Sequence, residues 1–279
     1  KGFGLEKIIS DKKLKKGFEF KHPKNKISIE KKPFHIPLTI GLLDQEGHEI
    51  TLRRADLSKV KKQNTNLLEI RKQKEKFVFE NIPVKPIPSF LRGFSAPVKL
   101  HFDYTDEELA FLMANDSDEF NRWDAGQKLM VRITINQIKF LNSGKKLNLP
   151  EELKFAFQSM LKQVKDDNSA FTALALSFPS ESYLSEFMEV IDVEEIFIVR
   201  SFLKKTIAQS LFSHFEKTYL NLQSFEDFKI DPISMGKRSL KNLCLEYMSE
   251  LESFEVRQMA QKQFRNNNNM TDVVGALKA

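Results

Sequence analysis

The fold is decided by residues 83–129, whose first half reads PVKPIPSFLRGFSAPVKLHFDY and whose second half, beginning at Thr105, reads TDEELAFLMANDSDEFNRWDAGQKL. Apolar and polar residues alternate over positions 98–104, which is the period of a half-buried strand. Thr105 and Glu108 have the spacing of a capping box, and an apolar stripe of helical period follows them. The stretch therefore predicts a junction between a β module and an α module.

The part before the junction, residues 1–104, has the pattern of a β domain. Short apolar or alternating runs separated by turn residues predict about seven strands, at residues 18–20, 27–29, 34–43, 49–52, 67–70, 77–79 and 98–104. That number in roughly a hundred residues is typical of an Ig-like β-sandwich. Pro37 predicts an edge or a bend in its strand, and the prolines from Pro83 to Pro97 place their segment on the outside of a sheet. Residues 1–16 are expected to be a linker, and residues 56–66 a loop.

The part after the junction, residues 105–279, is helical throughout. Helix-start signals are found at Ser117, Pro150, Ser180, Asp192 with Glu195, and Asp231 with Pro232, and further helical patterns cover residues 254–264 and 271 onward. The Ser143-Gly144 pair predicts the end of the second helix. Short loops between helices of this length indicate antiparallel neighbours stacked in pairs, a HEAT-like α-helical superhelical domain. We expect this domain to be incomplete at its C-terminus.

The charge is distributed unevenly between the two parts. Residues 1–104 contain 23 basic and 12 acidic residues, a net charge of +11, whereas residues 105–279 contain 21 and 26, a net charge of −5. Most of the excess lies in lysine clusters at residues 12–16, 31–32 and 59–62, where aromatic residues are few. Such clusters favour a solvated surface over a patch for nucleic acid or anionic lipid.

Cysteine and hydropathy restrict the compartment. Cys244 is the only cysteine, so no disulfide can form within the chain, and its apolar helical surroundings predict a buried, inert thiol. The sequence has no apolar run of about eighteen residues and no signal-type segment at its start. A cytoplasmic location and no contact with a membrane are therefore expected.

Several segments together resemble the bacterial aminopeptidase N family, zinc-dependent peptidases of the gluzincin group that remove N-terminal residues from peptides. The resemblance begins at about Lys32 and runs to the C-terminus. It is carried by FHIP (34–37), PIPSFLR (86–92), FSAPVKL (94–100), RWDA (122–125), FPSE (178–181), KRSLKN (237–242) and NNMTD (268–272). The resemblance implies a β-sandwich followed by a helical domain that closes over a catalytic cavity.

The chemistry of that family depends on two motifs that this sequence lacks. Zinc is held by H-E-x-x-H with a downstream glutamate, and G-A-M-E-N binds the amine of the substrate. The nearest approach is His48-Glu49, but position 52 is Leu, and the pair lies in an expected hairpin. No two of the five histidines (His22, His35, His48, His101, His214) are three to five residues apart. We therefore expect no catalytic, cofactor-binding or metal-binding residue in this chain, with the zinc in another part of the parent enzyme.

Other clusters have structural explanations. Arg122, Trp123 and Asp124 could bind a charged ligand, but a packed Trp beside an Arg paired with Glu119 or Asp118 is the simpler interpretation. Complete burial of this Trp predicts a loss of about 3–5 kcal/mol on replacement by Ala. Four carboxylate pairs occur, three of them in expected first turns of helices, where they offset the helix dipole (Glu107-Glu108, Glu151-Glu152, Glu194-Glu195 and, elsewhere, Asp166-Asp167).

The sequence thus favours a non-catalytic C-terminal fragment of a zinc-dependent aminopeptidase N. The chain would supply the scaffold and the wall of the cavity, its partners would be the upstream catalytic domain and short peptide substrates, and nucleic acid would not be one. The alternative is a free-standing interaction module, a basic β-sandwich with a helical solenoid, that binds an acidic partner or nucleic acid.

Overall fold

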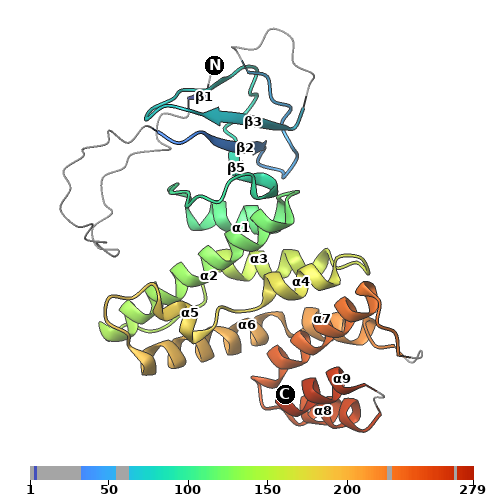
Figure 1. Cartoon of the computed structure of the whole chain (residues 1–279). Helices are drawn as coiled ribbons and strands as arrows, with labels where there is room; N and C mark the ends of the chain where they lie inside the picture. Colours follow the sequence, from blue (N-terminus) through green and yellow to red (C-terminus); the bar gives the residue numbers. More distant parts are fainter. Residues whose placement is uncertain (1–2, 5–32, 55–62, 225–227, 267–268) are drawn as a thin grey trace, which may run out of the picture. The chain divides into compact units, whose positions relative to one another are not determined.

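The computed structural model describes residues 3–4, 33–54, 63–224, 228–266 and 269–279 (Figure 1). The chain forms two compact units, Lys1–Tyr104 and Thr105–Ala279, and each is described here by itself. The predicted strands at residues 18–20 and 27–29 lie outside the described residues, as do the three lysine clusters and most of the predicted linker and of the loop at residues 56–66.

The first unit is built on a three-stranded antiparallel sheet of order β3-β2-β5 (Figure 1). Its strands are β2 (Ile36–Leu43), β3 (Thr65–Ile70) and β5 (Ile87–Phe90). A second, two-stranded sheet pairs β1 (Phe3–Gly4) with β4 (Val78–Phe79). The strand predicted at residues 49–52 is found only as isolated β-bridges. Glu49 lies opposite Leu43, and Leu52 lies opposite Gln63.

The two strand prolines occupy the positions that their missing N–H groups allow. Pro37 lies in the first half of β2, whose described pairing is with β3 alone, because β5 pairs only with Ile40–Leu43. Pro88 lies in β5, an edge strand of the described sheet. The edge predicted for Pro37 is confirmed. The segment from Pro83 to Pro97 is at an edge as expected, but its residues 87–90 form a paired strand, β5, that was not among the predicted strands.

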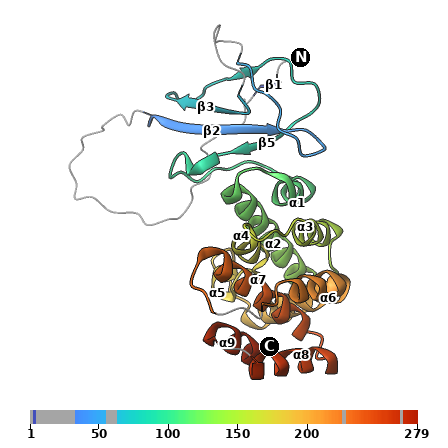
Figure 2. The same cartoon turned by 90° about the vertical axis from the view of Figure 1, so that its right-hand side faces the viewer.

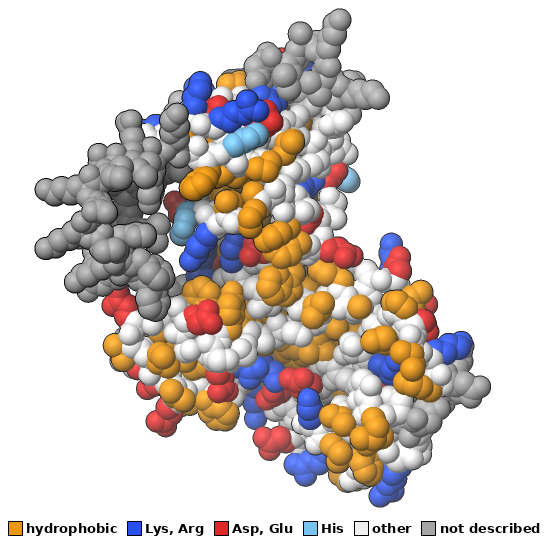
Figure 3. Space-filling model, viewed as in Figure 1, with side chains coloured by type: hydrophobic (Ala, Val, Ile, Leu, Met, Phe, Trp, Pro, Cys, Tyr) orange, Lys and Arg blue, Asp and Glu red, His pale blue; other side chains and the backbone are white. Residues whose placement is uncertain are grey.

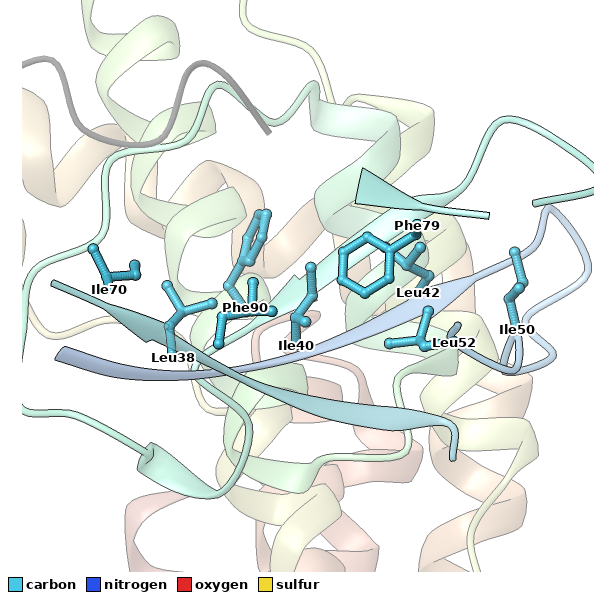
Figure 4. Packing of buried hydrophobic residues seen from close by; sticks show 9 residues of the cluster. Leu38, Ile40, Leu42, Ile50, Leu52, Ile70, Phe79 and Phe90 are labelled. Carbon is cyan, nitrogen blue, oxygen red and sulfur yellow. The ribbon is translucent and has the colours of Figure 1, made fainter. Parts of the chain in front are cut away.

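The core of this unit collects every second side chain of β2, Leu38, Ile40 and Leu42, with apolar side chains of the other strands and turns (Figure 4). Phe79 and Phe90 close it, and Phe79 is fully buried. Each such side chain contributes about 1.5–3 kcal/mol by leaving water. The alternation in β2 therefore fixes which face of the sheet is inside.

The strand predicted at residues 98–104 is wrong. The segment is irregular, with local hydrogen bonds from Val98 N to Ala96 O at 2.9 Å and from Tyr104 N to Phe102 O at 3.0 Å. The apolar residues of the alternating pattern still contact the core: Phe102 and Tyr104 pack against it, and the Tyr104 hydroxyl donates to Pro88 O at 2.7 Å. The alternating pattern therefore indicated that one face of this segment packs against the core, and not that the segment pairs with a neighbouring strand.

The second unit consists of helices stacked in neighbouring pairs (Figure 2). In the described residues they are α1 (Asp106–Asn115), α2 (Glu119–Asn142), α3 (Glu151–Lys162), α4 (Ser169–Leu176), α5 (Glu181–Ser185), α6 (Val193–Asn221), α7 (Pro232–Ser249), α8 (Phe254–Asn266) and α9 (Met270–Lys278). A β unit followed by a helical unit is the order that the sequence predicted.

The start of α1 shows how well cap chemistry locates a helix. Thr105 Oγ1 accepts from Glu108 N and Glu108 Oε2 accepts from Thr105 N, both at 3.1 Å, which is the predicted capping box. The predicted starts at Ser180 and Asp231 are confirmed in the same way, because each side chain accepts a hydrogen bond from the amide three residues later. The Ser143-Gly144 stop of α2 is also confirmed.

Three other predicted caps need correction. Asp118, not Ser117, is the N-cap of α2, because its carboxylate accepts from Asn121 N at 2.9 Å. Pro150 is the N-cap of α3 rather than its first residue. Asp192 is the N-cap of α6, but its side chain accepts a hydrogen bond from Asn142 at 3.3 Å instead of forming a capping box.

Helix α4 is absent from the sequence-based prediction. Its sequence, SAFTALAL, is apolar on nearly every side and so lacks a helical stripe. It packs directly on α7, where a Cβ added to Gly236 would lie 2.7 Å from Ala170 N. Among the described helices, none has both the length and the hydropathy needed to span a membrane.

Candidate functional site

The segments KRSLKN and NNMTD, which are far apart in the sequence, meet in the structure. Lys241 of α7 and Asp272 of α9 form an ion pair with 2.7 Å between Nζ and Oδ2. The two side chains are only 6% and 3% exposed. The positions of α8 and α9 beside each other, next to α7, can be followed in Figure 2. A buried ion pair requires further polar partners, because removing two charges from water is costly.

Amide side chains supply these partners. Asn269, the N-cap of α9, donates to Asp272 Oδ2 at 3.0 Å and accepts from Asp272 N at 2.9 Å. Gln263 of α8 donates to Asp272 O at 2.9 Å and to Asn242 Oδ1 at 2.7 Å. Asn242 in turn donates to Thr271 O at 3.2 Å. We call Lys241, Asn242, Gln263, Asn269 and Asp272 the polar cluster.

The polar cluster is suited to positioning and not to proton transfer or nucleophilic attack. The ammonium of Lys241 is held by a carboxylate, and the amides of Asn242 and Gln263 bond to each other and to the backbone. A Cβ added to Gly275 would lie 2.5 Å from Asn242, so α9 approaches α7 closely here. The cluster therefore fixes the register of α8 and α9 on α7 with few buried apolar side chains.

A second buried charge lies in the β unit. Arg92, which is 5% exposed, donates through Nη1 to Glu49 Oε1 at 2.6 Å and through Nε to Ser89 Oγ at 2.9 Å. Its guanidinium lies on Gly41 of β2, where a Cβ would meet Arg92 Cζ at 2.1 Å. Glycine is thus required at position 41 by close approach. Leu91 beside it adopts a positive φ of 58°. The arginine therefore ties the turn after β5 to Glu49 and to the sheet.

Arg122 and Trp123 differ from their predicted arrangement. Arg122 donates to the carbonyls of Met113 and Ala114 at the end of α1, at 3.0 and 3.2 Å, and the predicted partner Glu119 attracts it through its charge. It donates to carbonyls in the last turn of α1, where intrahelical partners run out, and Gln163 also donates to Ala114 O at 3.2 Å. Burial lowers the pKa of Arg122, which nevertheless remains charged at neutral pH.

Trp123 is half-buried, not fully buried, with its ring 6.0 Å from that of Phe120. Replacement by Ala is therefore expected to cost about 1–2 kcal/mol instead of the larger value that complete burial predicted. The adjacent Asp124 accepts from Lys128 at 2.5 Å. The three residues therefore have separate partners and do not converge on one site.

A third buried charge joins α6 to α7. Lys204 Nζ lies 2.9 Å from Glu246 and 2.6 Å from Glu250, and 5.8 Å from the ring centre of Tyr247. Tyr247 is fully buried, stacks on Phe215 and donates to Leu176 O of α4 at 2.8 Å. Burial raises the pKa of Tyr247 well above its ordinary value, so the phenol stays neutral and acts as a donor.

Cys244 is fully buried in α7, as its apolar surroundings predicted. Burial raises the pKa of its thiol, which removes the thiolate needed for nucleophilic chemistry. The pairs Glu107-Glu108, Glu151-Glu152 and Glu194-Glu195 lie in the first turns of α1, α3 and α6, as predicted.

The histidines of the described residues do not fit a catalytic zinc site. Within that part of the chain, one group of three metal-ligand residues lies close enough to share an ion: Asp44, Glu46 and His48, with ligand atoms within 4.8 Å of one another. The group is at a hairpin turn on the surface, and Asp44 Oδ1 already accepts from the amides of Glu46 and His48 at 2.9 Å. Exposed acidic groups of this kind are common without a bound ion, so the turn is not assigned as a metal site.

Sequence reasoning did not single out Lys241, Asp272, Arg92 or Lys204 as buried charges. The signal was weak but present in one case, since Lys241 lies between Leu240 and Leu245 in an apolar helical stretch. The partners of these charges lie between 31 and 46 residues away in the sequence, a separation that a periodic pattern does not report.

Two family models match the chain, one on each part. A domain of unknown function with an Ig-like fold (DUF3458) matches residues 10–103, and a domain of unknown function with ARM repeats (DUF3458_C) matches residues 106–279. The chain therefore combines an Ig-like unit with a helical repeat unit. The fold class predicted from the sequence is confirmed.

Similar proteins carry the name aminopeptidase. The chain is 34% identical over 251 residues to aminopeptidase N of Escherichia coli K12, covering 90% of this chain and 28% of that protein. It is 31% identical over 250 residues to aminopeptidase N of Haemophilus influenzae, covering 89% and 28%. The crystal structure of Legionella pneumophila aminopeptidase A in complex with aspartic acid has a TM-score of 0.71 and 29% identity, covering 87% of this chain and 28% of that chain.

The resemblance seen in the motifs is thus confirmed, and the chain spans about 28% of the length of these relatives.

Proposed function

Because this chain belongs to the DUF3458_C family, we propose that it is a non-catalytic part of a zinc-dependent aminopeptidase that removes N-terminal residues from peptides. One observation carries the proposal: the similarity to aminopeptidase N extends over 90% of this chain but only 28% of the E. coli protein. The catalytic zinc, its ligands and the amine-binding residues belong to the remainder of such an enzyme. No residue of this chain is proposed as catalytic, cofactor-binding or metal-binding.

The environment of the polar side chains supports a structural role. Three charges that could act chemically, those of Lys241, Arg92 and Lys204, are buried and held by carboxylates. Tyr247 and Cys244 are buried with raised pKa values. Groups fixed in this way hold helices and strands in register, which is what a scaffold and cavity wall require.

In the proposed enzyme the helical unit encloses the peptide cavity, and the Ig-like unit connects it to the catalytic domain upstream. The partners are that catalytic domain and short peptides, and the compartment is the cytoplasm. The finer assignments rest on the resemblance to aminopeptidase N, while the two-unit fold rests on the family models.

The proposal is tested with the purified chain in buffer that contains zinc. We expect no hydrolysis of alanyl or leucyl p-nitroanilide, and less than stoichiometric zinc by elemental analysis after dialysis. Turnover, or one tightly bound zinc per chain, would contradict the proposal that the catalytic zinc site lies outside this chain, because each requires a complete zinc site within these residues.

A second experiment tests whether this chain can serve as the non-catalytic part of an active aminopeptidase. A chimera of E. coli aminopeptidase N, in which this chain replaces the region that it matches, should fold and retain peptidase activity. A variant of the E. coli enzyme with that region deleted is the control and should be inactive or unstable. The alternative of a free-standing basic module predicts instead that the chain alone binds polyanion resin, with an affinity that falls steeply as salt increases.

A further inference from the structure

One surface of the helical unit is both acidic and apolar. Between Lys165 and Arg200 the sequence has eight acidic residues and no Lys, Arg or His. The same segment leaves large apolar side chains in solvent around the end of α5 and the start of α6. We call the following exposed residues the acidic apolar surface: Phe187, Val190, Ile191, Val193 and Phe197, with Glu186, Glu189 and Glu194.

The apolar side chains of this surface are not part of the core. Ile196 and Val199 of α6 are buried, whereas Val193 and Phe197, one helical turn apart, are 68% and 59% exposed. Val190 in the preceding loop is 74% exposed. Orange and red side chains lie interspersed in Figure 3 over the part of the helical unit where α5 and the start of α6 are drawn in Figure 1. Contiguous exposed apolar side chains with a polar rim mark interaction surfaces.

The acidic residues determine which partner fits. Glu194 and Glu195 also stabilise the first turn of α6 through its dipole, but that role does not account for Glu186 and Glu189 in the preceding segment. Tyr183 of α5 packs edge-on against Phe187, with 5.1 Å between their ring centres, and burial followed by the charges of Asp124 and Glu186 raises its pKa, so its phenol adds no charge of its own. A complementary partner must therefore carry positive charge next to apolar side chains.

We propose that the acidic apolar surface binds a polypeptide segment that presents lysine or arginine beside apolar residues, such as a basic amphipathic helix. The apolar side chains of Val193 and Phe197 would provide the contact area, and the carboxylates of Glu189 and Glu194 would orient the basic groups. This inference does not depend on the proposed function, since it concerns binding to the chain itself.

The probe is a fluorescein-labelled peptide of leucine and lysine, about five helical turns long, titrated with the purified chain and followed by anisotropy. A peptide with glutamate in place of lysine is the control. We expect binding of the lysine peptide only, weakened by added salt because the attraction includes charge. Equal binding of both peptides would overturn the proposal.

Substitutions locate the binding. Val193→Ser with Phe197→Ser should weaken binding of the lysine peptide at least about tenfold. Met270→Ser with Leu277→Ser removes comparably exposed apolar side chains from α9 and should leave it unchanged. Circular dichroism verifies that both variants are folded. Equal affinity of the first variant and the unsubstituted chain would overturn the proposal.

Two further measurements identify other occupants. Light scattering that shows a dimer disrupted by the Val193 and Phe197 substitutions would assign the surface to a second copy. Loss of peptide binding in the active chimera would assign it to contact with the rest of the enzyme. Either result would overturn the proposal, whereas a monomeric chain and a chimera that both bind the lysine peptide support it.

Discussion

The polar cluster allows a quantitative test of how the last two helices are held. Asp272→Asn keeps the shape of the side chain but removes the negative charge opposite Lys241, leaving an ammonium that is 6% exposed without its carboxylate. Lys241→Met makes the converse change and leaves the Asp272 carboxylate with Asn269 as its remaining side-chain partner in the described residues.

The expected losses follow from the burial of both groups. Breaking a buried ion pair on one side costs about 3–5 kcal/mol, since the surviving charge stays desolvated. Removing both charges avoids that penalty, so the double variant should cost no more than about 3 kcal/mol. The coupling energy between the two positions is then about 3 kcal/mol or larger.

Unfolding in urea, followed by far-ultraviolet circular dichroism, measures these free energies, because the signal comes mainly from the helical unit. The control is Lys128→Met, which breaks the solvent-accessible pair with Asp124 and should cost less than about 1 kcal/mol. Single losses below about 1 kcal/mol, or additive losses in the double variant, would refute the reasoning that this pair is buried and coupled.

Three other perturbations test separate contacts. Gly236→Ala should destabilise the chain by about 2 kcal/mol or more in urea, because its Cβ would lie 2.7 Å from Ala170 N; an unchanged midpoint would contradict this packing. Cys244 should not react with a thiol reagent until denaturant is added, since burial raises its pKa, and fast labelling of the native chain would mean that the thiol is accessible. Hydrogen bonds from the Ser234 hydroxyl and amide hold the pKa of Asp231 below its ordinary value of 3.8. The ionised Asp231 cap therefore stabilises the folded chain above pH 3.8, and this stabilisation is lost as the pH falls through the lower folded-state pKa. An NMR titration midpoint of Asp231 at or above 3.8 would contradict the cap.

The sequence correctly predicted features that depend on a few neighbouring residues, such as helix caps, a helix end and the position of a strand proline. The capping box of Thr105 and Glu108, the stop at Ser143-Gly144 and the edge position of Pro37 depend on a few neighbouring residues, and all three are found in the structure. Helix α4 lacked a stripe because it is apolar around its circumference, so the period that identifies a helix was missing.

Contacts between distant segments could not be predicted in this way. The alternation at residues 98–104 correctly indicated that Phe102 and Tyr104 pack towards the core, where they are partly buried. It did not reveal that the segment pairs with no strand of the described residues, because pairing depends on the partner strand. The ion pairs of Arg92 with Glu49 and of Lys241 with Asp272 likewise depend on tertiary structure. The motifs KRSLKN and NNMTD were noted as carriers of the resemblance, and the structure adds that residues from both form the polar cluster.

The central claim, that this chain is structural while the chemistry belongs to the rest of an aminopeptidase, is tested most directly by comparing one rate in two proteins. Hydrolysis of alanyl p-nitroanilide is measured for the chimera with E. coli aminopeptidase N and for the chain alone, in the same zinc-containing buffer. We predict turnover by the chimera and none by the chain. Turnover by the chain alone, or a folded chimera that is inactive, would contradict the claim.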